Sequence, residues 1–163
     1  KAQNIIGAEM IIYTAAILQD NPELVTAKKS GIPCFERAAL FGAISRMYSN
    51  CIAVCGTHGK TTTSGMASFV LDKAGLEPAF VVGGIVPEIY TNAQHKSGKF
   101  FTAELDESDG TLVKYYPDIL VINNLEEDHL DFYKNGMDDI IKVFEKWGFG
   151  GRKAFFKKFS SPA

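Results

Sequence analysis

The stretch GTHGKTT, residues 56–62, joins the all-apolar run CIAVC at residues 51–55 to a segment that is typical of a helix over residues 60–74. Glycines at both ends of the loop allow a tight turn and let backbone N–H groups approach phosphate oxygens. The start of the following helix presents its own N–H groups and the positive end of its dipole to the same anion. The stretch therefore predicts a phosphate-binding loop in an α/β domain.

Two side chains of this stretch carry the expected chemistry. Lys60 supplies a positive charge for the β- and γ-phosphates, and the hydroxyl of Thr61 is a ligand for Mg²⁺. The loop departs from the common pattern G-x-x-x-x-G-K-[ST], because Val54 stands at the position of the first glycine. We therefore expect a shorter loop in which Gly56 makes the turn. The alternative is a chance Gly-Lys-Thr in an ordinary strand–helix turn.

A cluster of acidic residues follows the apolar run at residues 99–105. The sequence AELDESD, residues 103–109, holds four carboxylates at the end of this expected strand. Ligands of open α/β sheets gather at the carboxyl ends of the strands. Like charges so close together repel one another, and a divalent cation such as Mg²⁺ relieves that repulsion through oxygen ligands. Alone, an acidic solvated loop would explain the cluster; beside a phosphate loop, a magnesium site is favoured.

A third polar segment is NNLEEDHLD, residues 123–131, which follows the apolar run PDILVIN at residues 117–123. His129 within it is a metal ligand, a base or an incidental surface residue. Three strand ends are expected to meet at one edge of the sheet, and two of them are acidic, which favours a functional histidine.

The chain alternates strands and helices, as is typical of a mostly parallel sheet flanked by helices. Expected strands cover residues 10–17, 32–35, 51–55, 78–82, 99–105 and 117–123, and expected helices cover residues 22–30, 36–48, 60–74 and 137–147. Asn21 is the expected N-cap of the first helix, and Gly31 and Gly75 are expected helix stops. On the second helix, we expect one apolar face of Ala39, Leu40, Ala43, Ile44 and Met47. We expect a domain boundary near residue 49, a second domain over residues 50–147 and an unmatched tail over residues 148–163.

Composition excludes several classes of protein. Of the 163 residues, 46% are hydrophobic and 22% charged, which is enough apolar material for a packed core. The net charge of −2 without a basic stripe argues against nucleic-acid binding, and no apolar run reaches the ~18–20 residues that span a bilayer. Three cysteines without a regular framework favour a reducing cytoplasm, with Cys51 and Cys55 as small apolar residues of a buried strand.

The motifs GTHGKTTT, AELDESDG and NNLEEDHLDFY, in this order, resemble the central domain of the Mur ligases. The histidine of the first motif and the DESD of the second resemble the branch that joins L-alanine to UDP-N-acetylmuramate. Upstream, MIIYTAAI, NPELVTAKKSGIP and ERAAL resemble the end of that family's Rossmann-like UDP-binding domain. The resemblance covers about residues 8–147 and implies a cytoplasmic enzyme with a P-loop-type ATP-binding domain.

The resemblance also implies cofactors and site residues. It implies ATP at the loop residues Gly56, Thr57, His58, Gly59, Lys60, Thr61 and Thr62. It implies one Mg²⁺ on Thr61 and Glu104 and a second on Glu104 and His129. Lys60, Glu104 and His129 are the implied catalytic residues. The resemblance further implies that five residues face the sugar nucleotide: His58, Asp106, Glu107, Ser108 and Asp109.

The implied reaction is ATP-dependent amide formation in peptidoglycan precursor synthesis. The lactyl carboxylate of UDP-N-acetylmuramate attacks the γ-phosphate to give an acyl phosphate, and the amino group of L-alanine displaces the phosphate. The family's UDP-binding glycine loop, adenine-binding segments and C-terminal domain have no counterpart in these 163 residues, so we expect the chain to be inactive alone. Alternatives are a ligase of the same family that recycles murein tripeptide, a stand-alone nucleotide-binding module and a truncation that folds without activity. The oligomeric state is left open.

Overall fold

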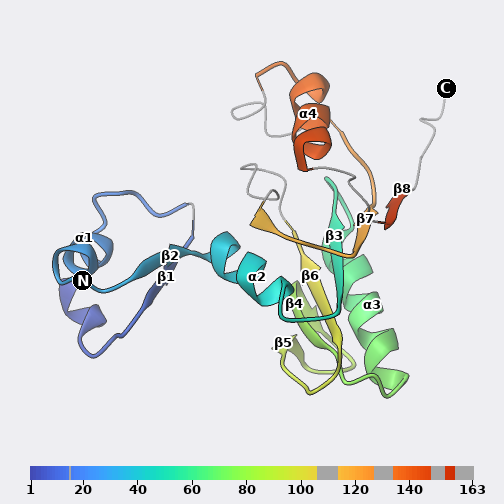
Figure 1. Ribbon diagram of the computed structural model, residues 1–163, viewed down its shortest axis with the longest axis horizontal. Helices are drawn as coiled ribbons and strands as arrows, with labels where there is room; N and C mark the ends of the chain where they lie inside the picture. The colour runs from blue at the N-terminus through green and yellow to red at the C-terminus, as the bar shows by residue number, and fades with distance from the viewer. Residues whose placement is uncertain (15, 106–113, 127–133, 148–152, 157–163) are drawn as a thin grey trace.

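Two sheets of different size organise the chain (Figure 1). The computed structural model describes residues 1–14, 16–105, 114–126, 134–147 and 153–156. The smaller sheet pairs β1 (Ile11–Tyr13) in parallel with β2 (Cys34–Glu36). The larger sheet has six strands in the order β5-β4-β6-β3-β7-β8, and all neighbours run parallel except the antiparallel pair β4–β5. The expected mostly parallel sheet flanked by helices is confirmed.

The bounds of the remaining elements follow the chain order. The strands of the larger sheet are β3 (Asn50–Cys55), β4 (Ala79–Val86), β5 (Thr91–Gln94), β6 (Phe100–Glu104), β7 (Ile119–Ile122) and β8 (Lys153–Phe156). The helices are the 3-10 helix η1 (Ala2–Ile5), α1 (Pro22–Lys29), α2 (Arg37–Ser45), α3 (Lys60–Lys73) and α4 (Met137–Trp147). In the part of the chain described, no helix is both long enough and apolar enough to cross a membrane.

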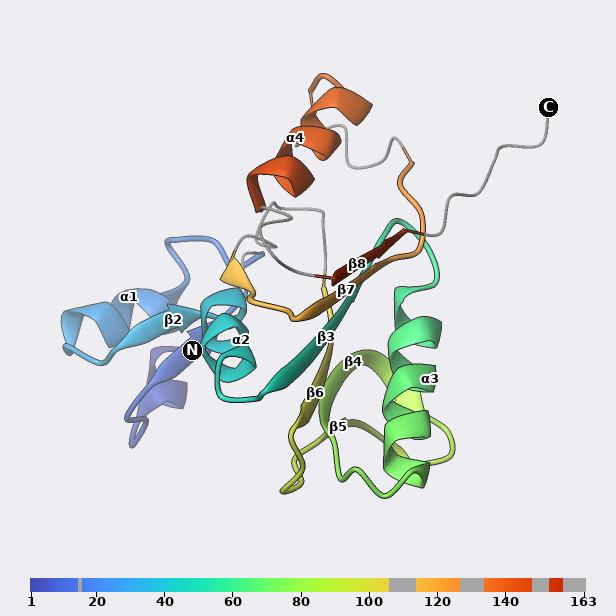
Figure 2. The same cartoon turned by 45° about the vertical axis from the view of Figure 1, so that its right-hand side comes forward.

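The core lies on both faces of the larger sheet, and α2 and α3 lie on opposite sides of it (Figure 2). Side chains of a strand alternate between faces, and β4 shows this clearly. Ala79 and Val81 join the cluster that contains Ala38 of α2, whereas Phe80 and Val82 pack with Phe69 of α3. β3, paired with β6 and β7, is central and almost fully buried, as its apolar run predicted.

The helix ends follow the expected turn chemistry. The side chain of Asn21 accepts hydrogen bonds from the N–H groups of Glu23, at 2.9 Å, and Leu24, at 3.4 Å, and so caps α1. Gly31 and Gly75, both at φ of 71°, follow α1 and α3 in the left-handed region that glycine adopts without penalty. These three expectations are confirmed.

The first expected strand and the apolar face of the second helix are corrected. β1 is shorter than residues 10–17 and only half-buried, because its hydrogen-bonded partner is β2 alone in a two-stranded sheet. On α2, the buried residues are Ala38, Gly42 and Ser45. Of the expected face, Ile44 does pack against the core, whereas Met47, beyond the end of the helix, is 80% exposed. The reason is a close approach: a Cβ on Gly42 would lie 2.0 Å from the carbonyl oxygen of Lys114.

Two further corrections concern strands. β4 continues through Gly83 and Gly84, where the sequence predicted its end, and turns back as the unexpected strand β5. Residues 153–156 form the strand β8, which the sequence did not predict, and pair with β7 from Ile119↔Lys153 to Ile122↔Phe156. The unmatched tail over residues 148–163 stays a prediction. The domain boundary near residue 49 stays a prediction.

Candidate functional site

The loop between β3 and α3 requires glycine at both ends. Gly56 has a φ of 126°, and a Cβ there would lie 2.7 Å from the carbonyl oxygen of Asn124. Gly59, at φ of 78°, is the N-cap of α3, and the first hydrogen bond of the helix runs from the Thr63 N–H to the Gly59 carbonyl at 3.0 Å. The N–H groups of residues 60–62 precede that ladder, so the helix start presents its positive dipole end to the loop.

Two asparagines that follow β7 hold this loop in place. The backbone carbonyl of Asn124 accepts from the Thr57 N–H at 3.3 Å, and its side-chain oxygen accepts from the His58 N–H at 2.8 Å. The side-chain amide of Asn123 donates to the His58 carbonyl at 3.2 Å, and its oxygen accepts from the Thr63 hydroxyl, also at 3.2 Å. Sequence reasoning did not assign these residues a role. Their signal was a pair of side chains with donors and acceptors directly after a strand.

The carboxylate of Glu104 lies beside the start of α3. Its Oε1 accepts from the Thr61 hydroxyl at 3.0 Å, and its Oε2 accepts from the Gly83 N–H at 2.7 Å. A Cβ on Gly83 would lie 2.8 Å from each of these oxygens, so the glycine leaves the space that the carboxylate fills. This close approach explains why β4 contains glycine in its interior. The sequence pointed to Thr61 and Glu104 but not to Gly83.

His58 lies at the rim of the site. Its Nε2 is 3.7 Å from a carboxylate oxygen of Glu126, and both side chains are more than half exposed. The Glu126 N–H also donates to the Thr57 hydroxyl at 3.1 Å, which ties the start of the third polar segment to the loop.

The other predicted site residues, Asp106, Glu107, Ser108, Asp109 and His129, lie outside the described residues. Within the described ranges, no group of three or more His, Cys, Asp or Glu side chains is arranged to hold a metal ion. The donor pair that is present, the hydroxyl of Thr61 and the carboxylate of Glu104, consists of hard oxygen ligands of the kind that Mg²⁺ prefers.

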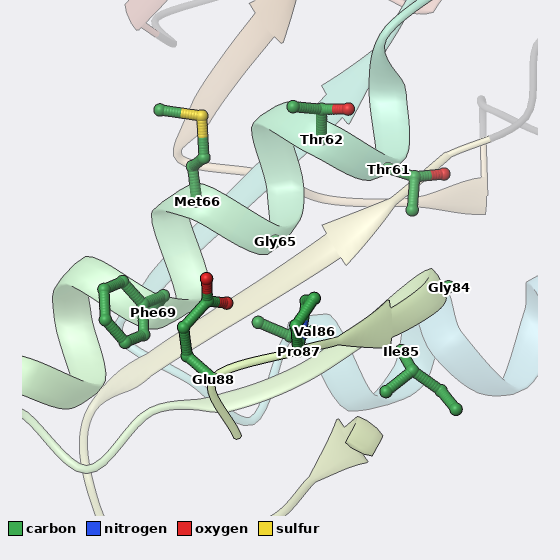
Figure 3. A pocket seen from close by; sticks show the side chains of 10 residues that line it. All are labelled: Thr61, Thr62, Gly65, Met66, Phe69, Gly84, Ile85, Val86, Pro87 and Glu88. Carbon is green, nitrogen blue, oxygen red and sulfur yellow. The ribbon is translucent and has the colours of Figure 1, made fainter. Parts of the chain in front are cut away.

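An open pocket of about 320 Å³ extends from this site between α3 and β4 (Figure 3). Thr61 lies at one end of it and Phe69 at the other, two turns further along the helix, with Val86 and Pro87 opposite (Figure 3). Apart from Thr61, Thr62 and Glu88, its lining side chains are apolar. The site therefore combines a helix N-terminus, a lysine, a hydroxyl–carboxylate pair and an adjoining apolar groove.

Comparison with known proteins identifies relatives over most of the chain. UDP-N-acetylmuramate–L-alanine ligases from Pelobacter propionicus and Gloeobacter violaceus are 43% and 42% identical over 147 residues. Each match covers 90% of this chain and 32% of the relative, so the chain spans about a third of the length of these curated proteins.

Solved structures show the same fold. The UDP-N-acetylmuramate–alanine ligase of Thermotoga maritima matches with a TM-score of 0.81 and 34% identity, over 90% of this chain and 34% of that chain. A UDP-N-acetylmuramate:L-alanyl-γ-D-glutamyl-meso-diaminopimelate ligase from Neisseria meningitides matches with a TM-score of 0.79 and 25% identity, over 99% of this chain and 56% of that chain. The family model of the Mur ligase middle domain matches residues 54–148. The chain therefore belongs to the Mur ligase family.

Proposed function

We propose that this chain carries the phosphate- and magnesium-binding part of an ATP-dependent ligase that joins L-alanine to UDP-N-acetylmuramate. One observation carries the chemical half of the proposal: the Thr61 hydroxyl at the start of α3 lies 3.0 Å from the Glu104 carboxylate at the end of β6. The substrate half is supported by the names of the curated relatives. Because the chain spans about a third of those relatives, the complete reaction is proposed for the full-length protein.

The proposal assigns tasks to residues of the loop and of the two polar segments that follow β6 and β7. The N-terminus of α3 and Lys60 bind the β- and γ-phosphates of ATP through N–H groups and a positive charge. Thr61 and Glu104 would hold one Mg²⁺, and Glu104 with His129 a second. Bound there, the metal would neutralise charge on the phosphate oxygens and on the incoming carboxylate. The proposal assigns contact with the sugar nucleotide to His58, Asp106, Glu107, Ser108 and Asp109.

The proposed reaction has two steps. A lactyl carboxylate oxygen attacks the γ-phosphorus, and the bond from that phosphorus to the bridging oxygen breaks. ADP departs, and the sugar nucleotide now carries an acyl phosphate. The nitrogen of L-alanine then attacks the acyl carbon, inorganic phosphate leaves and the nitrogen loses a proton. In the first step the task of this chain is to hold the two anions in line and reduce their repulsion. All three cysteines are thiols, which fits the reducing cytoplasm where we propose the reaction occurs.

The test uses the full-length protein that contains this chain. We expect phosphate release that depends on both ATP and L-alanine, and we expect Lys60→Ala to abolish it. The matched control is Lys29→Ala, which removes an exposed lysine at the end of α1 and leaves turnover unchanged. Full turnover by Lys60→Ala would contradict the proposed role of the loop.

A second candidate function is the ligation of a murein tripeptide to the same sugar nucleotide. It is supported by the Neisseria meningitides structure, which covers 99% of this chain and is named for a tripeptide substrate. Offering L-alanine and L-alanyl-γ-D-glutamyl-meso-diaminopimelate side by side to the full-length protein separates the two. Preferential use of L-alanine supports the first proposal, and preferential use of the tripeptide supports the second.

A further inference from the structure

Asn123 and Asn124 make four hydrogen bonds to the loop and to the first turn of α3. Two of these bonds use the backbone N–H groups of Thr57 and His58 as donors. In phosphate-binding loops, consecutive backbone N–H groups are the usual donors to the anion. Here two of them are directed at the end of β7 instead.

We propose that Asn123 and Asn124 are positioning residues of the phosphate loop. Asn124 turns the N–H groups of Thr57 and His58 away from the nucleotide, and Asn123 holds the loop against α3. The phosphates are then received by the start of α3, with its N–H groups and dipole, rather than by the loop before it. This inference rests on the proposed function, because it refines which atoms of the same site contact ATP.

The need for such positioning follows from the loop's composition. A glycine-bounded turn has many accessible conformations when nothing restrains it, and ordering it at the moment of binding costs affinity. Asn124 restrains the loop through its backbone and side chain, and a Cβ on Gly56 would lie 2.7 Å from its carbonyl oxygen. Asn123 links the His58 carbonyl to the Thr63 hydroxyl and so fixes the loop relative to α3.

The experiment measures the affinities of ATP, ADP and AMP for the full-length protein and its variants. We expect Asn124→Ala and Asn123→Ala each to lower the affinity for ATP and for ADP about tenfold, the loss typical of one or two hydrogen bonds. AMP has no β- or γ-phosphate, so its affinity should change less than twofold. The matched control is Asn135→Ala, which also removes an asparagine side chain with hydrogen bonds, here to Asp139 in the first turn of α4. It should leave all three affinities unchanged.

The outcomes separate the inference from the proposed function. If Lys60→Ala weakens ATP while both asparagine variants bind it normally, the phosphate site stands and the positioning role is wrong. If the asparagine variants lose affinity for ATP, ADP and AMP equally and also melt at a lower temperature, the two side chains act on general stability, and the inference is also wrong. If Lys60→Ala binds ATP normally, the proposed phosphate site itself fails, and this inference fails with it.

Discussion

The Thr61 hydroxyl donates to the Glu104 carboxylate at 3.0 Å, although 43 residues separate the two in the chain. The order of the strands brings them together. β3 and β6 are parallel neighbours with Val54 opposite Glu104, so the helix that follows β3 begins beside the end of β6. The pair is therefore a property of the sheet, and a change at either residue, or at the Gly83 N–H that holds the carboxylate, alters the same site.

We expect Glu104→Gln to raise the Mg²⁺ concentration needed for half-maximal activity by about tenfold or more, because the amide keeps the shape but loses the charge. The measurement is a Mg²⁺ titration of phosphate release by the full-length protein. Glu9→Gln, which changes an exposed glutamate before β1, is the control and should leave the titration unaltered. Superimposable Mg²⁺ curves for Glu104→Gln and the unmodified protein would argue against a metal at this carboxylate.

We expect Gly83→Ala to displace the Glu104 carboxylate, because the added Cβ would lie 2.8 Å from both of its oxygens. Activity and Mg²⁺ dependence should be lost with little change in melting temperature. Gly65→Ala in α3 is the matched control: its Cβ would lie 3.5 Å from Val86, an ordinary contact. Alanine is favoured over glycine in a helix by about 0.5–1 kcal/mol, so this control should keep Mg²⁺ dependence and melt no lower. Unaltered Mg²⁺ dependence in Gly83→Ala would contradict the prediction.

Local patterns were enough to predict the strand, the glycine-bounded loop and the helix of residues 51–74, and the helix ends. The apolar run at residues 51–55 and the caps at Asn21 and Gly75 act through neighbouring residues, so a short window contains their cause. The positive φ angles of Gly56 and Gly59 are local too, but the close approach of Asn123 and Asn124 to them is not. The meeting of strand ends at one sheet edge also followed from general rules of parallel sheets, and it brought Thr61 to Glu104 as expected.

Features set by distant contacts could not be predicted. The sequence predicted that the strand ends at Gly83, yet Gly83 lies inside β4. A side chain at this position would overlap with the carboxylate of Glu104, which comes from another strand. The fully buried positions of α2 include Gly42 and Ser45, which contact residues 114–116, while the larger Phe41 and Ile44 pack against the core only partly buried. The strand β8 could not be predicted from its own sequence, because it is formed by pairing with β7, which lies more than 30 residues earlier in the chain.

We expect Gly42→Ala to destabilise the chain, although alanine is the better helix former. The gain in helix propensity is about 1 kcal/mol, whereas forcing a side chain into a packed contact typically costs about 1–3 kcal/mol. The contact here is severe, since the Cβ would lie 2.0 Å from the Lys114 backbone oxygen, which moves less easily than a side chain. A lower urea midpoint for Gly42→Ala, beside an equal or higher one for Gly65→Ala, is the expected result. A raised midpoint in both variants would show that α2 does not approach Lys114 closely.

The carboxylate of Asp72 near the end of α3 should make stability depend on pH. A hydrogen bond from Lys96 is the main cause that lowers its pKa below the usual value, and the Gln94 amide, at 3.3 Å from Oδ1, lowers it further. A carboxyl whose pKa is lower in the folded chain stabilises the fold above its unfolded pKa of about 3.9, and this stabilisation is lost as the pH falls through the folded value.

We therefore expect Asp72→Asn to be less stable than the unmodified chain at neutral pH, with the difference shrinking as the pH falls below about 4. Urea midpoints measured from pH 7 down to about pH 3 test this. Glu23 and Asp139 also have lowered pKa values, so the pH dependence of the urea midpoint of the unmodified chain has contributions from several carboxylates. The difference between the unmodified chain and Asp72→Asn isolates the contribution of Asp72. Lys96→Met removes the cation instead and should show the same convergence at low pH. Curves that stay parallel across the whole range would mean that this ion pair does not form in solution.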